Sequence, residues 1–167
     1  MTLPRFSAGH AVAPILVFGI GNPSRGDDAM GPLLIERLAE EQVAGRLKGV
    51  DLLTDFQLQP EHALDLHGRA RVIFVDAAIG GPEPFGWMAI APDTGIAHST
   101  HSTSPAELLA IYHRLYGTPP CCELVAIRGY DFELGSGLTA RAESNLATAC
   151  RAIATRIASA GSSPANG

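Results

Sequence analysis

The sequence predicts a single α/β domain in which a mostly parallel sheet carries helices on both faces. Short apolar runs, typical of buried strands, alternate along the chain with segments of helical periodicity. The 167 residues suit one core, and 46% hydrophobic with 17% charged residues is an ordinary globular composition. We therefore treat 1–167 as one domain. We expect 1–13 and 158–167 to be flexible ends, because the first segment lacks periodicity and the second is rich in Ala, Ser, Gly and Pro.

The apolar runs place the strands. Residues 71–75 form the clearest one, and Asp76 follows it directly. Further strands are expected at 15–19, 50–53, 85–91 and 123–128. Because sites in parallel sheets lie at the carboxyl ends of the strands, polar residues that follow these runs are the first candidates for function.

Periodicity and capping signals place the helices. A short helix is expected at 60–67, with Pro60 in its first turn. Ser104-Pro-Ala-Glu107 is typical of a capped helix start. Three longer helices have apolar stripes: Met30, Leu33, Leu34 and Leu38; Leu108, Ile111, Tyr112 and Leu115; and Leu146, Ala149, Cys150, Ile153, Ala154 and Ile157.

Composition excludes several classes of protein. A net charge of -5 disfavours nonspecific nucleic-acid binding. No stretch approaches the roughly 20 apolar residues that a membrane span needs, and residues 1–14 lack the apolar run of a secretory leader. Three cysteines, two of them adjacent, suggest neither a disulfide framework nor a zinc site. We expect a cytoplasmic monomer whose partners include neither nucleic acid nor a membrane.

The loop from Gly19 to Gly31 (GIGNPSRGDDAMG) connects the first strand to the first long helix, where dinucleotide-binding folds hold pyrophosphate. A GxGxxG motif would need glycine at the position of Ser24, and the acidic pair Asp27-Asp28 would repel phosphate. Nucleotide binding is therefore disfavoured. A carboxylate near a helix N-terminus is favoured in its charged form and can ligate a cation. We expect this role of Asp28, whereas Asp27 is better explained as a cap of the helix.

Two more candidates fall at the same predicted edge. Asp76 ends a buried apolar run, where a carboxylate is costly without a partner or a function. His98 and His101 precede the helix that starts at residue 105, and either could be a neutral metal ligand. Two aspartates and one histidine form a mixed oxygen and nitrogen set that suits nickel, zinc or a similar divalent ion.

Other protease motifs are weak. Asp93-Thr-Gly95 matches the aspartic-protease tripeptide, but it occurs once, and we interpret it as a turn. The GxSxG motif of serine hydrolases is absent, and no motif surrounds Cys121-Cys122. His62 and His67 are five residues apart, and we interpret both as surface residues.

Taken together, the motifs resemble those of the [NiFe]-hydrogenase maturation proteases, endopeptidases specific to hydrogenase large subunits. The resemblance covers 15–157 and depends on Gly19-x-Gly-Asn22, Asp27-Asp28, Gly31, the strand that ends in Asp76, and His101 before a helix. Segment 57–61 is similar to one in members that serve soluble, cofactor-reducing hydrogenases. The resemblance implies a twisted five-stranded sheet between helices.

The resemblance also implies function. Asp28, Asp76 and His101 would be the catalytic and nickel-contacting residues, with His98 as the rival to His101. Some relatives carry Glu where Asp28 stands. The nickel would come with the substrate, the precursor of the large subunit, and no tightly bound organic cofactor is expected. Asp28 or Asp76 could act as general base in an aspartic type of hydrolysis, or nickel could assist it. The alternatives are a nucleotide-binding protein and a non-proteolytic nickel chaperone.

Overall fold

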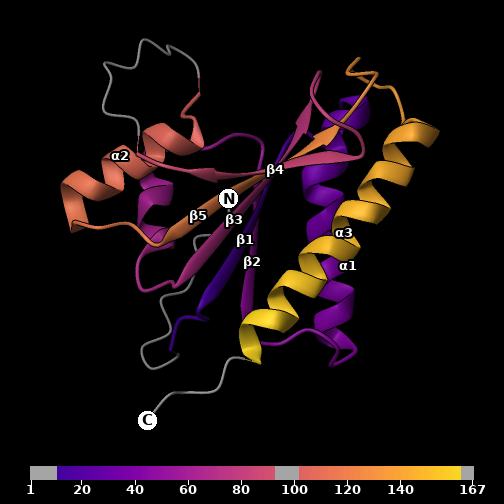
Figure 1. Cartoon of the computed structure of the whole chain (residues 1–167). Coiled ribbons are helices and arrows are strands. Elements are labelled where there is room, and N and C mark those ends of the chain that lie inside the picture. Colours follow the sequence, from indigo (N-terminus) through magenta and orange to yellow (C-terminus); the bar gives the residue numbers. More distant parts are fainter. Residues whose placement is uncertain (1–10, 93–101, 163–167) are drawn as a thin grey trace.

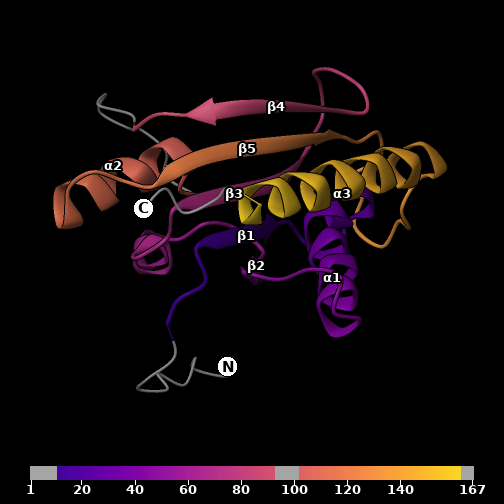
Figure 2. The same cartoon turned by 60° about the horizontal axis from the view of Figure 1, so that its bottom comes forward.

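One five-stranded sheet forms the centre of the protein, whose computed structural model describes residues 11–92 and 102–162. The strands are β1 (Ile15–Ile20), β2 (Val50–Asp55), β3 (Arg71–Ala78), β4 (Phe85–Ile90) and β5 (Cys121–Arg128). Their order is β2-β1-β3-β5-β4, and only β4 runs antiparallel to its neighbour. Figure 2 shows β4 and β2 at opposite edges of this sheet.

Helices cover both faces of the sheet, as Figure 1 shows. On one face lie α1 (Met30–Val43) and α3 (Ala140–Gly161), and the other face carries α2 (Pro105–Tyr116) and the 3₁₀ helix η2 (Pro60–Leu66). A second 3₁₀ helix, η1 (Gly26–Ala29), leads into α1. Alternate residues of each strand enter two separate cores, so Val17 and Val75 face α1 and α3, whereas Phe18 and Phe74 face α2. The predicted three-layer α/β fold is confirmed.

Two glycines let α1 pack directly against β1. A Cβ atom on Gly19 would lie 2.4 Å from the carbonyl oxygen of Gly31, and one on Gly31 would lie 2.2 Å from that of Ile20. Both neighbours are backbone atoms, which no rotamer change can move away. This close approach fixes where the loop after β1 leaves the sheet, and that loop carries Asp27 and Asp28.

All expected strands and helices are present, and two details differ. Leu115, expected in the buried stripe of α2, is 64% exposed, whereas Leu109 is fully buried. The last turn of α2 packs through Tyr112 and Tyr116 against the His67 ring, so Leu115 points away from this contact. Helix α3 extends to Gly161, so part of the expected flexible end is helical.

Within the described ranges, no helix has both the length and the apolar character to cross a membrane.

The predicted start of α2 is confirmed in atomic detail. The Ser104 hydroxyl accepts a hydrogen bond from the backbone N–H of Glu107 at 3.2 Å. The Glu107 carboxylate in turn accepts one from the backbone N–H of Ser104 at 2.6 Å. This capping box satisfies two backbone donors that would otherwise lack partners at the helix start.

Candidate functional site at the carboxyl edge of the sheet

Asp28 and Asp76 come together at the carboxyl ends of β1 and β3. These strands are parallel neighbours, with Gly19 opposite Val75, so the loop after β1 starts beside Asp76. Burial and, to a smaller extent, the negative charge of Asp28 raise the pKa of Asp76 to about 7, against the opposing effect of a hydrogen bond from the backbone N–H of Ala77. At neutral pH, Asp76 is therefore divided between its acid and its carboxylate form, as general acid–base chemistry requires.

Asp28 is held in place by the glycine-containing turn that precedes it. Its Oδ2 atom accepts a hydrogen bond of 2.8 Å from the backbone N–H of Asn22. Gly21 has φ +146°, and a Cβ atom at this position would lie only 2.0 Å from the carbonyl oxygen of Asp28. The turn thus needs glycine at residue 21, and it anchors one oxygen of the Asp28 carboxylate.

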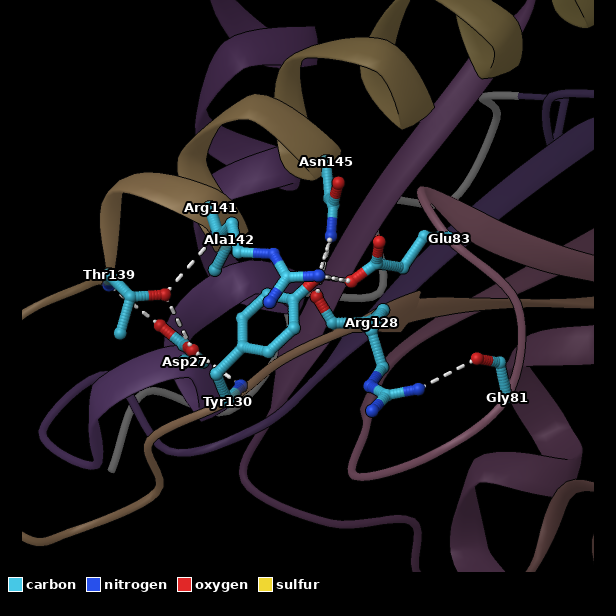
Figure 3. A network of polar contacts seen from close by, with 9 residues as sticks. All are labelled: Asp27, Gly81, Glu83, Arg128, Tyr130, Thr139, Arg141, Ala142 and Asn145. Atoms are coloured by element: carbon cyan, nitrogen blue, oxygen red, sulfur yellow. Dashed lines mark hydrogen bonds and ion pairs between the residues drawn. The ribbon is translucent and has the colours of Figure 1, made fainter.

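Asp27, the neighbour of Asp28, has a structural role. Its side chain is fully buried and accepts hydrogen bonds from the backbone N–H groups of Tyr130, Asp131 and Thr139 and from the Thr139 hydroxyl (Figure 3). Burial alone would raise the pKa of Asp27, but these hydrogen bonds outweigh it and lower the pKa below its ordinary value. The carboxylate makes no cap hydrogen bond to η1 or α1. The prediction that Asp27 caps the helix after β1 was therefore wrong.

A polar latch of Glu83, Tyr130 and Arg141 joins the loop after β3 to the start of α3 (Figure 3). The Tyr130 hydroxyl donates a short hydrogen bond to Glu83, which also forms an ion pair of 2.6 Å with Arg141. The Arg141 guanidinium lies 4.3 Å from the centroid of the Tyr130 ring. Asn145 adds a hydrogen bond of 2.9 Å to the Tyr130 hydroxyl. The latch ties the loop after β3, the strand that carries Asp76, to the loop after β5 and to the start of α3. No sequence motif indicated it.

His62 is a second residue that sequence reasoning misjudged. Its side chain is 16% exposed, so the expectation of a surface residue was wrong. Its Nε2 atom lies 3.3 Å from the Asp55 carboxylate, and its Nδ1 atom accepts a hydrogen bond from the backbone N–H of Gln59. Asp55 ends β2 opposite Ile20, which puts this pair on the carboxyl edge too. The sequence did contain a signal for this pair: Asp55 ends a strand, and His62 is the third residue of the short helix that follows.

The histidines expected at the site, His98 and His101, lie outside the described residues, as does Asp93. Within 11–92 and 102–162, no group of three His, Cys, Asp or Glu residues could hold a metal ion. The structure thus brings together two of the three predicted site residues, Asp28 and Asp76, and their role toward nickel stays a prediction.

Two of the three cysteines, Cys122 and Cys150, are poor candidates for a nucleophile. All three are free, and Cys122 is buried. Burial, together with nearby negative groups, raises the pKa of Cys122 to about 12, and burial also raises the pKa of Cys150. Both thiols are therefore protonated at neutral pH, and the reactive thiolate is scarce.

Fold and site together define an α/β protein with a carboxylate pair at the carboxyl edge of its sheet. The structure is similar to that of the [NiFe] hydrogenase maturation protease HycI from Thermococcus kodakarensis KOD1, with a TM-score of 0.67 and 24% sequence identity over 87% of this chain and 92% of that one. It is also similar to the hydrogenase maturating endopeptidase HybD from E. coli, with a TM-score of 0.69 and 22% identity over 88% of this chain and 93% of that one. These likenesses show that the chain has the fold of these proteins.

A third similar structure is the endopeptidase HycI from Escherichia coli, with a TM-score of 0.61 and 18% identity over 84% of this chain and 89% of that one. No family model and no curated protein matches the chain by sequence. The comparison thus depends on the arrangement of helices and strands over nearly the full length of both proteins.

Proposed function

We propose that this protein is an endopeptidase that removes a short C-terminal peptide from the nickel-loaded precursor of a [NiFe]-hydrogenase large subunit. The observation that carries the proposal is the Asp28–Asp76 pair at the carboxyl edge of the sheet, where the pKa of Asp76 is raised to about 7. The fold, similar to that of hydrogenase maturation proteases from two organisms, supports the same function. We further propose that it acts as a monomer in the cytoplasm.

Nickel enters this proposal as cargo of the substrate. Two carboxylates and one imidazole without a thiolate make an open, weak site, which suits an ion that the substrate itself also ligates. We propose His101 as the imidazole. The backbone N–H of Thr103, the second residue after His101, donates a hydrogen bond to the carbonyl of Leu58, which belongs to the core on the α2 face. Asp76 alternates with Val75 along β3 and so belongs to this same face.

Two routes to hydrolysis agree with the geometry. In the first, Asp76 accepts a proton from the attacking water, while burial and the charge of Asp28 keep the pKa of Asp76 high enough for this task. In the second, the substrate's nickel polarises the scissile carbonyl, and the two carboxylates position the ion. The first route predicts that Asp76→Asn abolishes cleavage but not docking. The second predicts that cleavage also fails when the precursor carries no nickel, even with both carboxylates intact.

The deciding experiment is a mass measurement of the nickel-loaded precursor after incubation with this protein. Loss of a C-terminal peptide is expected with the native chain and with the control Glu36→Gln, which changes an exposed carboxylate of α1. Asp28→Asn, Asp76→Asn and His101→Ala are each expected to slow cleavage at least about 100-fold, the usual effect of losing one acid–base group. Normal processing in all three variants would refute the site. Tight binding of the precursor without cleavage would instead indicate a chaperone.

A further inference from the structure

Three large apolar side chains are exposed on segments that follow strands at the carboxyl edge of the sheet. Phe56 comes directly after β2 and is 63% exposed, and Ile79 comes directly after β3 and is 79% exposed. Leu134 lies in the loop after β5 and is 74% exposed. We call these three residues the apolar rim. A single exposed apolar residue needs no explanation, but three around one proposed site indicate a surface that another molecule covers.

Backbone hydrogen bonds fix the position of Leu134. The N–H of Gly135, the next residue, donates to the carbonyl of Ser24 at 2.8 Å. In return, the N–H of Gly26 donates to the carbonyl of Ser136 at 3.1 Å. The loop that follows β5 is therefore joined on both sides of Leu134 to the loop between β1 and α1, which carries one member of the carboxylate pair.

Phe56 and Ile79 are fixed to the same edge by the strands that precede them. Asp55, the residue before Phe56, accepts at its carbonyl a hydrogen bond of 3.1 Å from the N–H of Gly21, in the turn after β1. Ile79 is three residues beyond Asp76 on the segment that continues β3. The apolar rim thus belongs to segments that hold, or are held by, the loop and the strand of the proposed site.

The position of the apolar rim determines which molecule can cover it. A peptide bond that is cut at Asp76 has to reach the carboxyl edge of β3, so the chain that contains this bond crosses the loops of the neighbouring strands. In the order β2-β1-β3-β5, Phe56 follows a strand on one side of β3 and Leu134 follows the strand on the other side. The distance from β2 to β5 is about 14 Å, which about four extended residues span.

We propose that the apolar rim binds apolar side chains of the hydrogenase precursor on both sides of the bond that is cut. This role rests on the proposed endopeptidase function and adds to it the chemistry of the segment that is recognised. Contact with the precursor removes apolar surface of both partners from water, which favours binding. The rim residues are therefore specificity residues, and the proton transfer at Asp76 does not involve them.

Serine substitutions test the apolar rim through the kinetics of precursor cleavage. Phe56→Ser, Ile79→Ser and Leu134→Ser are each expected to raise KM about 5-fold with little change in kcat, because the lost contact serves binding alone. The triple variant is expected to raise KM at least about 100-fold. Phe56→Leu keeps an apolar side chain and should retain a KM close to that of the native chain.

Val43→Ser and Leu115→Ser are the matched controls. Each changes an apolar side chain that is at least as exposed as Phe56. Val43 ends α1 shortly before β2 begins, and Leu115 lies near the end of α2, before β5 begins, so both belong to the opposite edge of the sheet. Neither is expected to change KM. An equal rise in the controls, or a native KM in the triple variant, would overturn the role of the apolar rim.

Binding without turnover separates this role from the proteolytic function. In an Asp76→Asn background, the unchanged rim is expected to bind the nickel-loaded precursor at least about 100-fold more tightly than the triple serine variant does. Serine in place of the apolar residues beside the cut in the precursor should remove most of this difference. Binding that depends on the rim without cleavage by the native chain would refute proteolysis alone. Equal binding by both rim variants, or polar residues on both sides of the cut, would refute the rim alone.

Discussion

Asp27 and Thr139, 112 residues apart in the sequence, are joined by two hydrogen bonds. Both the backbone N–H and the hydroxyl of Thr139 donate to the buried carboxylate, at 2.8 and 2.9 Å. Thr139 is also the N-cap of α3, because its hydroxyl oxygen accepts a hydrogen bond from the backbone N–H of Ala142. One carboxylate thus positions the start of the longest helix, while its neighbour Asp28 faces Asp76. Of these two adjacent aspartates, Asp27 has a structural role, and Asp28 is the one that we propose for function.

Asp27→Asn is expected to lower the free energy of unfolding by about 2–4 kcal/mol, since the amide loses the charge and one of its two acceptor atoms. Thermal or urea unfolding at pH 7 measures the loss. Asp28→Asn serves as the control and should cost less than about 1 kcal/mol, because within 11–92 and 102–162 Asp28 accepts a single backbone hydrogen bond, and it is less buried. An equal effect of the two substitutions would contradict the structural role of Asp27.

Asp27 should also contribute to acid unfolding. Its folded pKa lies below the ordinary value of 3.8, so its ionised form stabilises the fold at higher pH. This contribution is expected to be complete above pH 3.8 and to disappear as the pH falls through the lower folded pKa. Unfolding midpoints of the native chain and Asp27→Asn, measured between pH 2 and 7, should therefore converge at the acid end. A constant difference over this range would argue against the lowered pKa.

Asp76→Asn is expected to stabilise the protein at pH 8 by about 2 kcal/mol, while it removes cleavage activity. The folded pKa of about 7 exceeds the ordinary value of 3.8, so the folded state binds the proton more tightly than the unfolded state does. The native chain therefore loses stability as the pH rises from 3.8 through 7, whereas the asparagine variant does not. Unfolding curves at pH 4 and pH 8 test this: the gain should be small at pH 4 and large at pH 8.

The influence of Asp28 on Asp76 has a direct readout. In Asp28→Asn the negative neighbour is gone, and the pKa of Asp76 is expected to fall toward its ordinary value, though burial keeps it raised. Titration of the Asp76 carboxyl carbon by ¹³C NMR in both proteins measures this shift. An unchanged midpoint would show that the two carboxylates do not interact.

Gly31→Ala is expected to destabilise the fold by more than about 3 kcal/mol, because its new methyl group would overlap the backbone of Ile20 and push α1 away from β1. Gly80→Ala is the matched control: a Cβ atom there has no heavy atom within 4 Å, and its effect should stay within about 0.5 kcal/mol. Melting temperatures of the two variants make the comparison. Similar values would show that β1 and α1 can separate without cost.

The sequence by itself determined which segments are strands and helices, because their periodicity and capping depend on residues only a few positions apart. It placed Ser104 at the start of α2, which is confirmed, and it placed Asp76 directly after a strand, whereas β3 continues past Asp76 to Ala78. Only the tertiary structure decided that β4 runs antiparallel at the edge, that Asp27 bonds to Thr139, and that Glu123 lies between two arginines under α3. The physical reason is distance along the chain. These contacts join residues 30 or more positions apart, and they exist only because the packed sheet brings distant segments together.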